Sequence, residues 1–219
     1  MAIGSRLLLL AFCLVFTVNI FGQARQIISG EFYASLRAAV DKGKDRPQRH
    51  TIQEDYFRDG KVHSSEIYVY EYETSDRFRY VHTTKDGNII KKEELIQIGK
   101  DYFCRKDKGQ WTKSENWCAR MNISGLPDTV ESGVTVEKTM LGKQEATLYQ
   151  RQVTWKNVHS PNADKEGLSY LQTKFWLDSG GLLIRQERTM GLLEPEEVRS
   201  KNVSTYEYDV KIKIDAPVK

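Results

Sequence analysis

The sequence predicts a mainly β protein with some helix (α+β): a single antiparallel sheet of about eleven strands that curls on itself, preceded by one helix. From His50 to Lys113, short alternating segments are separated by turn dipeptides such as Asp59-Gly60 and Asp86-Gly87. Strand-favouring residues between Asp/Gly turns at this spacing are typical of an antiparallel meander. The pattern resumes in the second half, with turn signals at Gly142-Lys143 and Ser179-Gly180-Gly181.

The start of the chain, residues 1–24, is expected to be a secretory signal peptide. Arg6 supplies a basic region, Leu7 to Phe21 is an apolar run, and Gly22-Gln23-Ala24 places small residues at a cleavage site. The apolar run is too short, and too soon followed by polar sequence, for a membrane span. We therefore expect a periplasmic protein (secreted if the host lacks a periplasm), with a single domain over residues 25–219 that contacts a membrane peripherally at most.

The helix is expected from Ile28 to Asp41. Ile28, Phe32 and Leu36 recur at helical spacing, with charged residues on the other side. Pro47 follows a stretch rich in Lys, Gly and Asp, and marks the end of the helix.

Eleven strands should follow this helix. In the second of them, Tyr68, Tyr70 and Tyr72 should share one face, and in the third Phe78 and Tyr80 should share a face. Two stretches, 115–134 and 191–201, lack the alternation and are expected to hold loops or short helical excursions. The strands are predicted at residues 51–58, 61–72, 77–84, 89–98, 101–106, 110–114, 135–141, 145–156, 169–178, 182–190 and 203–214.

Charge and cysteine content narrow the function classes. The chain has 33 basic and 30 acidic residues, so nothing in its balance calls for nucleic acid. Without the signal peptide two cysteines remain, Cys104 and Cys118, and an even pair in an exported protein predicts a disulfide. The alternative is two separate buried thiols. The histidines do not cluster with the cysteines at metal-ligand spacing, so we expect neither a metal nor a cofactor.

Catalytic motifs are scarce. The chain has no G-x-S-x-G, no GxGxxG and no P-loop. The segment Phe175 to Gly180 matches the Asp-Ser-Gly shape of an aspartic protease loop, but that chemistry needs two carboxylates and only Asp178 is present. A hairpin turn explains the same residues. We therefore expect no enzyme and no catalytic residue, with a hydrolase as the outside alternative.

The aromatic residues are the remaining positive signal. A sheet this long either closes or needs a cover, and one helix is a thin cover. An apolar ligand cavity would explain both the aromatic residues and the thin cover of the sheet. The helix, through Ile28, Phe32 and Leu36, would close this cavity. The residues expected to line it are Tyr68, Tyr70, Phe78, Trp111, Trp155 and Phe175.

Nearly the whole chain after the signal peptide resembles the periplasmic lipoprotein-carrier superfamily, the LolA-like and LppX-like lipid-binding proteins. The resemblance implies an unclosed antiparallel β half-barrel of about eleven strands around an apolar cavity, with helices as its lid. The N-terminal helix would be the long element of that lid. Members of the family carry acyl chains. Beyond the first helix, the segments that carry the resemblance are Tyr70–Tyr80, Glu94–Gly99, Asp101–Phe103, Gly109–Trp111, Phe175–Arg185 and Tyr206–Pro217.

Two functions follow from these observations. The first is a non-enzymatic carrier or sensor that binds a lipid or acylated ligand, such as a lipoprotein, in the half-barrel. The second is an envelope interaction module with a filled barrel, which would bind a protein partner through loops such as 115–134 or 157–168.

Overall fold

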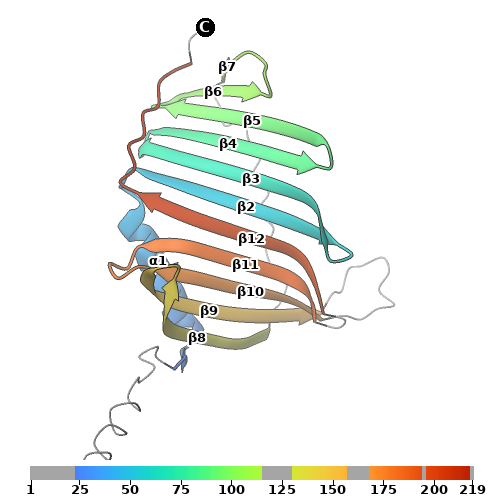
Figure 1. Cartoon of the computed structure of the whole chain (residues 1–219). Helices are drawn as coiled ribbons and strands as arrows, with labels where there is room; N and C mark the ends of the chain where they lie inside the picture. The colour runs from blue at the N-terminus through green and yellow to red at the C-terminus, as the bar shows by residue number, and fades with distance from the viewer. Residues whose placement is uncertain (1–22, 115–129, 157–167, 194–195, 218–219) are drawn as a thin grey trace, which may run out of the picture.

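The structure is a computed structural model that describes residues 23–114, 130–156, 168–193 and 196–217. Twelve strands form one sheet in the order β1-β8-β9-β10-β11-β12-β2-β3-β4-β5-β6-β7, and every neighbouring pair is antiparallel. The end strands β1 and β7 each pair with one neighbour only, so the sheet is unclosed (Figure 1). This confirms a mainly β fold with a large unclosed antiparallel sheet.

The elements follow the expected order along the chain. One helix precedes the long strands, and hairpins connect most of those strands. The bounds are β1 Arg25–Gln26, α1 Ser29–Gly43, β2 Gln48–Arg58, β3 Lys61–Thr74, β4 Arg77–Asp86, β5 Ile89–Ile98, β6 Asp101–Lys106, β7 Thr112–Ser114, β8 Val130–Leu141, β9 Gln144–Lys156, β10 Leu168–Leu177, β11 Leu183–Leu193 and β12 Glu196–Tyr208.

The last strand corrects two expectations. The short helix expected within 191–201 is wrong, because β11 runs to Leu193 and β12 begins at Glu196. Pairing with β11 from Glu196, joined by pairing with β2 from Ser200, holds this polar segment extended. The strand expected to reach residue 214 ends at Tyr208, because Asp209 has a φ of 57°. Among the described residues α1 is the only helix, so the short helical excursions of the lid find no counterpart there.

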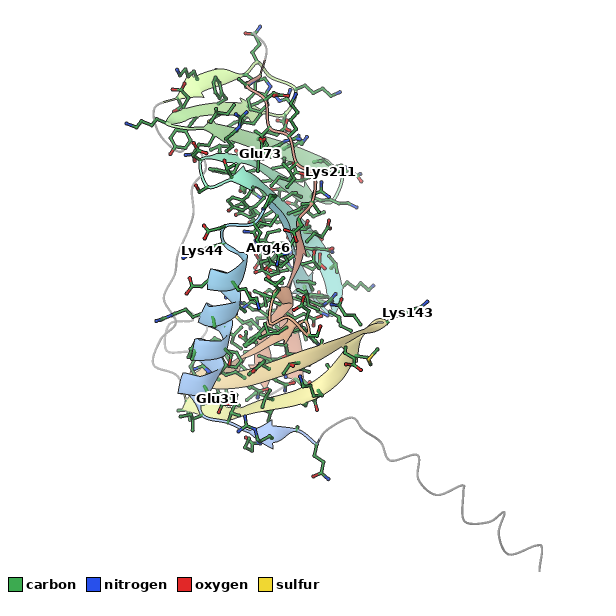
Figure 2. All side chains as sticks on the ribbon, turned by 90° about the vertical axis from the view of Figure 1, so that its left-hand side faces the viewer. Glu31, Lys44, Arg46, Glu73, Lys143 and Lys211 are labelled. Carbon is green, nitrogen blue, oxygen red and sulfur yellow. The ribbon has the colours of Figure 1, made fainter. Side chains whose placement is uncertain are left out.

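Helix α1 lies against one face of the sheet and covers only part of that face. Figure 2 shows the sheet continuing well beyond the end of the helix marked by Lys44. The backbone of α1 lies closest to β9 and β11, and its Phe32 contacts Phe175 of β10, on the half of the sheet that starts at β1. Glu31 in the first turn and Lys42 in the last turn suit the helix dipole.

The C-terminal end of α1 is fastened at Tyr208. Gly43 is buried against this ring, whose hydroxyl donates a hydrogen bond of 3.0 Å to the carbonyl oxygen of Leu183. Arg46 lies over the ring of Tyr208, 5.6 Å from its centroid, and pairs with Asp209. The ring is therefore held between three groups and has little freedom to move.

Replacing Gly43 with Ala should lower the free energy of unfolding by about 2 kcal/mol, because overpacking a filled contact has this order of cost. The new Cβ would lie 2.6 Å from Cε1 of Tyr208. Chemical denaturation of the purified variant measures the change. Gly30→Ala is the matched control, because its nearest atom is 3.9 Å away and Ala favours a helix. Equal stability of the Gly43 variant and the wild type would show that the helix end is not fastened in this way.

The residues after β12 form an extended C-terminal segment rather than a strand. Ile214 is buried, its backbone N–H donates to Glu73 at 2.9 Å, and its carbonyl accepts from Arg77 at 2.5 Å. Figure 1 shows this segment crossing the ends of the strands toward β6. The alternation from Val210 to Ile214, which we interpreted as strand, instead places apolar side chains against those strand ends.

Candidate functional site

The half of the sheet beneath α1 is filled by a hydrophobic core. Phe175 on β10 is fully buried, with its ring 4.9 Å from Phe32 of the helix and 4.6 Å from Tyr149 of β9. Leu36 packs against the same cluster, as does Tyr206 of β12. Here helix and sheet are in direct contact.

The same face continues beyond the helix as an aromatic surface. Residues paired directly across antiparallel strands project to the same side of a sheet. One such row runs from Tyr206 through His50, Tyr70 and Tyr80 to Leu95, crossing β12, β2, β3, β4 and β5. We call the cluster on β3 to β5 the tyrosine face. It consists of Tyr68, Tyr70, Tyr72, Phe78, Tyr80 and Leu95, with Tyr102 and Cys104 packed against it.

The rings of the tyrosine face pack on one another. Centroids of Tyr70 and Tyr80 lie 5.0 Å apart, and those of Tyr72 and Phe78 lie 5.6 Å apart. Burial raises the pKa of Tyr70, of Tyr72 and of Tyr80, so these hydroxyls stay neutral at physiological pH. The surface is therefore apolar, with phenol groups as its polar points.

His50 lies between the helix-covered core and the tyrosine face. Its ring is stacked between Tyr206, at 4.1 Å, and Tyr70, at 5.6 Å. Burial lowers the pKa of His50 to about 4, so the imidazole is neutral at pH 7. Its Nε2 atom is buried and has no hydrogen-bond partner within the described part of the chain.

A polar row borders the aromatic rows. Glu54 and Glu66 are direct cross-strand partners, and Asn202 and then Arg188 continue the row on β12 and β11. Burial raises the pKa of Glu54, and the nearby charge of Glu66 adds to this effect. The face is thus amphipathic along the strand direction.

The opposite face of the sheet carries an ion-pair network. The Glu94 carboxylate is 1% exposed and accepts hydrogen bonds from Arg79, at 3.0 Å, and from Arg105. Burial opposes ionisation, but the hydrogen bonds from Arg105, Arg79 and Lys92 hold the pKa of Glu94 below its ordinary value. Trp111 belongs to this side, because Arg105 lies 4.6 Å above its ring.

The structure therefore brings together only some of the residues expected to line a cavity. Tyr68, Tyr70 and Phe78 lie in the tyrosine face, and Phe175 lies on the same side beneath the helix. Trp155 pairs with Ser169 and shares the side of Phe175, further along β9. Trp111 does not join the group.

Two helix residues, Phe32 and Leu36, pack toward the sheet as the lid expectation requires, whereas Ile28 is 75% exposed. Sequence reasoning missed His50 and Gln186 as members of the face that carries Phe175 and the tyrosine face. Tyr80 was expected to share a face with Phe78, as it does, but it was not among the expected lining residues.

Several expectations fall on undescribed residues. Cys104 lies on β6, but Cys118 lies outside the described residues, so the disulfide stays a prediction. The same holds for the signal peptide over residues 1–22 and for most of the two candidate interaction loops.

The Asp178 motif forms a hairpin turn. The side chain of Asp178 accepts the backbone N–H of Leu182 at 2.8 Å, and Gly181 has a φ of 79°. Gly181 also donates its backbone N–H to the carbonyl of Asp178. These contacts confirm the turn interpretation of this segment.

Comparisons with known proteins add a likeness in shape. No model of a known protein family matches the sequence, and no curated protein matches it significantly. The solved structures that resemble it include two mycobacterial proteins. The lipoprotein LppX of Mycobacterium tuberculosis aligns over 86% of this chain and 100% of its own, with 12% identity and a TM-score of 0.43. LprF from Mycobacterium bovis aligns over 87% and 99%, with 9% identity and a TM-score of 0.43.

These two matches confirm the resemblance to LppX-like proteins. Because both TM-scores are low, we take nothing about ligands or sites from either protein. Within the described residues, no helix has the length and apolar character to span a bilayer. No group of His, Cys, Asp and Glu there has the arrangement of a metal site.

Proposed function

We propose that the protein is a non-enzymatic carrier or sensor that binds the apolar part of a lipid or acylated ligand against the tyrosine face. The observation that carries this proposal is the continuation of one aromatic face from the helix-covered half to β5, through the stacked row of Tyr206, His50, Tyr70 and Tyr80. Aromatic walls with a few polar points are typical of sites for apolar ligands. The unclosed sheet would act as a half-barrel, with α1 as part of its lid.

Burial of acyl chains would supply the binding energy. Each methylene removed from water contributes about 0.8 kcal/mol. The hydroxyls of Tyr70 and Tyr80 are neutral, so a hydrocarbon chain on the tyrosine face meets no desolvated ion there. Glu54 and Glu66 lie at the border of the tyrosine face, outside its aromatic rows.

Replacing Tyr70 with Asp should weaken binding of an apolar fluorescent dye, displaceable by fatty acid or phospholipid, at least tenfold. A charge placed within the wall must be desolvated by the ligand, and about 1.4 kcal/mol corresponds to that factor. Titration of dye fluorescence measures the affinity. Ile67→Asp is the control, because Ile67 lies on the same strand, on the opposite face, and is 40% exposed. Absence of saturable, displaceable dye binding to the folded wild type would overturn the proposal.

A further inference from the structure

Two buried nitrogen atoms on the proposed binding face lack a hydrogen-bond partner among the described residues. They are Nε2 of His50 and Nε2 of Gln186. Gln186 is 8% exposed and lies on β11, directly between Phe175 of β10 and Ser204 of β12. Buried polar groups in proteins nearly always have a hydrogen-bond partner, and a buried group without one costs free energy. A bound molecule can supply the partner that the chain does not.

Both side chains lie at the boundary between the helix-covered core and the tyrosine face. Gln186 pairs with Ser204, and His50 pairs with Tyr206 two residues further along β12. Strand and residue spacings of ~4.8 Å and ~3.4 Å put their Cα atoms about 12 Å apart. A single atom therefore does not serve both nitrogens, whereas a head group with several oxygen atoms does.

The residues around the two nitrogen atoms indicate which charge the bound head group carries. Gln186 is neutral at every pH, and the imidazole of His50 is neutral at pH 7, so neither offers a counter-charge to a buried ion. In the neighbouring row Glu54 and Glu66 lie between two cations, Arg188 and Lys91, so this row favours neither sign of charge. The amide N–H of Gln186 needs an acceptor, and the neutral imidazole accepts or donates according to its tautomer. Carbonyl and hydroxyl oxygens satisfy both.

We infer that the ligand carries an uncharged, oxygen-rich head, such as the glycerol ester of an acylglycerol, which hydrogen-bonds to Gln186 and His50 while its acyl chain lies on the tyrosine face. This inference rests on the proposed function and adds the chemical class of the ligand. It places the polar recognition site at the junction of β11, β12 and β2 rather than at an end of the sheet.

Three probes with the same twelve-carbon chain test the head group: monolaurin, laurate and dodecylamine. Their affinities are measured by displacement of the apolar dye diphenylhexatriene from the full-length mature protein. Monolaurin should bind at least tenfold more tightly than either charged probe. Equal or tighter binding of laurate or dodecylamine would overturn the inference.

The variants Gln186→Leu and His50→Phe test the two residues. Each replaces an unpartnered polar group with an apolar one of similar shape, so the thermal midpoint of the ligand-free protein should hold or rise. The ratio of monolaurin affinity to dye affinity should fall about tenfold in each variant. Lower stability with unchanged monolaurin affinity would assign the two residues a structural role and overturn the inference.

The same titrations separate this inference from the proposed function. If the dye binds but monolaurin does not compete better than the charged probes, the head-group assignment fails and apolar binding stands. If wild-type protein, shown to be folded by circular dichroism, binds neither dye nor monolaurin, the proposed function itself fails.

Discussion

Replacing Phe175 with Ala should lower the free energy of unfolding by about 4 kcal/mol, the largest loss that we expect from a single side chain. The ring is fully buried and meets Phe32 edge-on and Tyr149 face to face. Truncating a buried Phe costs roughly 3–5 kcal/mol, because transfer energy is lost and a cavity remains. The variant also removes the central contact between α1 and the sheet.

Urea denaturation followed by far-ultraviolet circular dichroism measures this loss. Tyr33→Ala is the matched control, because it truncates an aromatic ring of the same helix that is 48% exposed. Its cost should be about 1 kcal/mol or less, the size of its contact with Arg151. A Phe175 variant no less stable than the Tyr33 variant would mean that α1 is not held to the sheet by this core.

The second large effect is a loss of stability on acidification that depends on His50. Burial lowers the pKa of His50 from 6.5 to about 4 in the folded protein. Between these values the unfolded chain binds a proton that the folded protein does not, so stability falls as the pH falls. The stabilising contribution is complete above about pH 6.5 and is lost by about pH 4. The free energy of unfolding lost over this interval is about 3 kcal/mol, from ~1.4 kcal/mol per pH unit.

Denaturation series from pH 4 to pH 7 measure this slope. His50→Phe should remove it, because the ring shape is kept without a proton site. His63→Gln is the control, since His63 is exposed. A slope that persists in the His50 variant would show that other groups carry the acid sensitivity.

The hairpin-rich part of the fold could be predicted because local signals agreed there. In β3, the alternation that places Tyr68 and Tyr70 on one face also matches the register with β2 and β4. The positive φ of Gly60 and of Gly87 supports the turns at the Asp-Gly pairs. In such segments composition and tertiary structure favour the same conformation.

The errors arose where pairing with distant strands overrides local composition. The start of β12 from Glu196 is polar, and its pairing with β11 makes it a strand. Trp111 follows Asp107, whose φ of 49° is part of the turn that sets the register of the three-residue strand β7. A shift of one residue there changes the face on which the indole lies.

The residues that contact buried polar groups also could not be predicted from the neighbouring sequence. Nothing near His50 in the sequence indicates that its ring is stacked between Tyr206 and Tyr70, since Tyr206 lies 156 residues away in the chain (206 minus 50). Gln186 has an ordinary strand context, and only the assembled sheet shows that its amide is buried. The amphipathic character of the face therefore required the structure.

The most direct test of the central claim is mass spectrometry of an organic extract from the purified exported protein, compared with the Tyr70→Asp variant and an unrelated exported protein. We expect a stoichiometric acyl lipid with the wild type, and its loss from the Tyr70 variant. An extract free of acyl lipid, from wild-type protein shown to be folded, would contradict the claim that the tyrosine face binds such ligands.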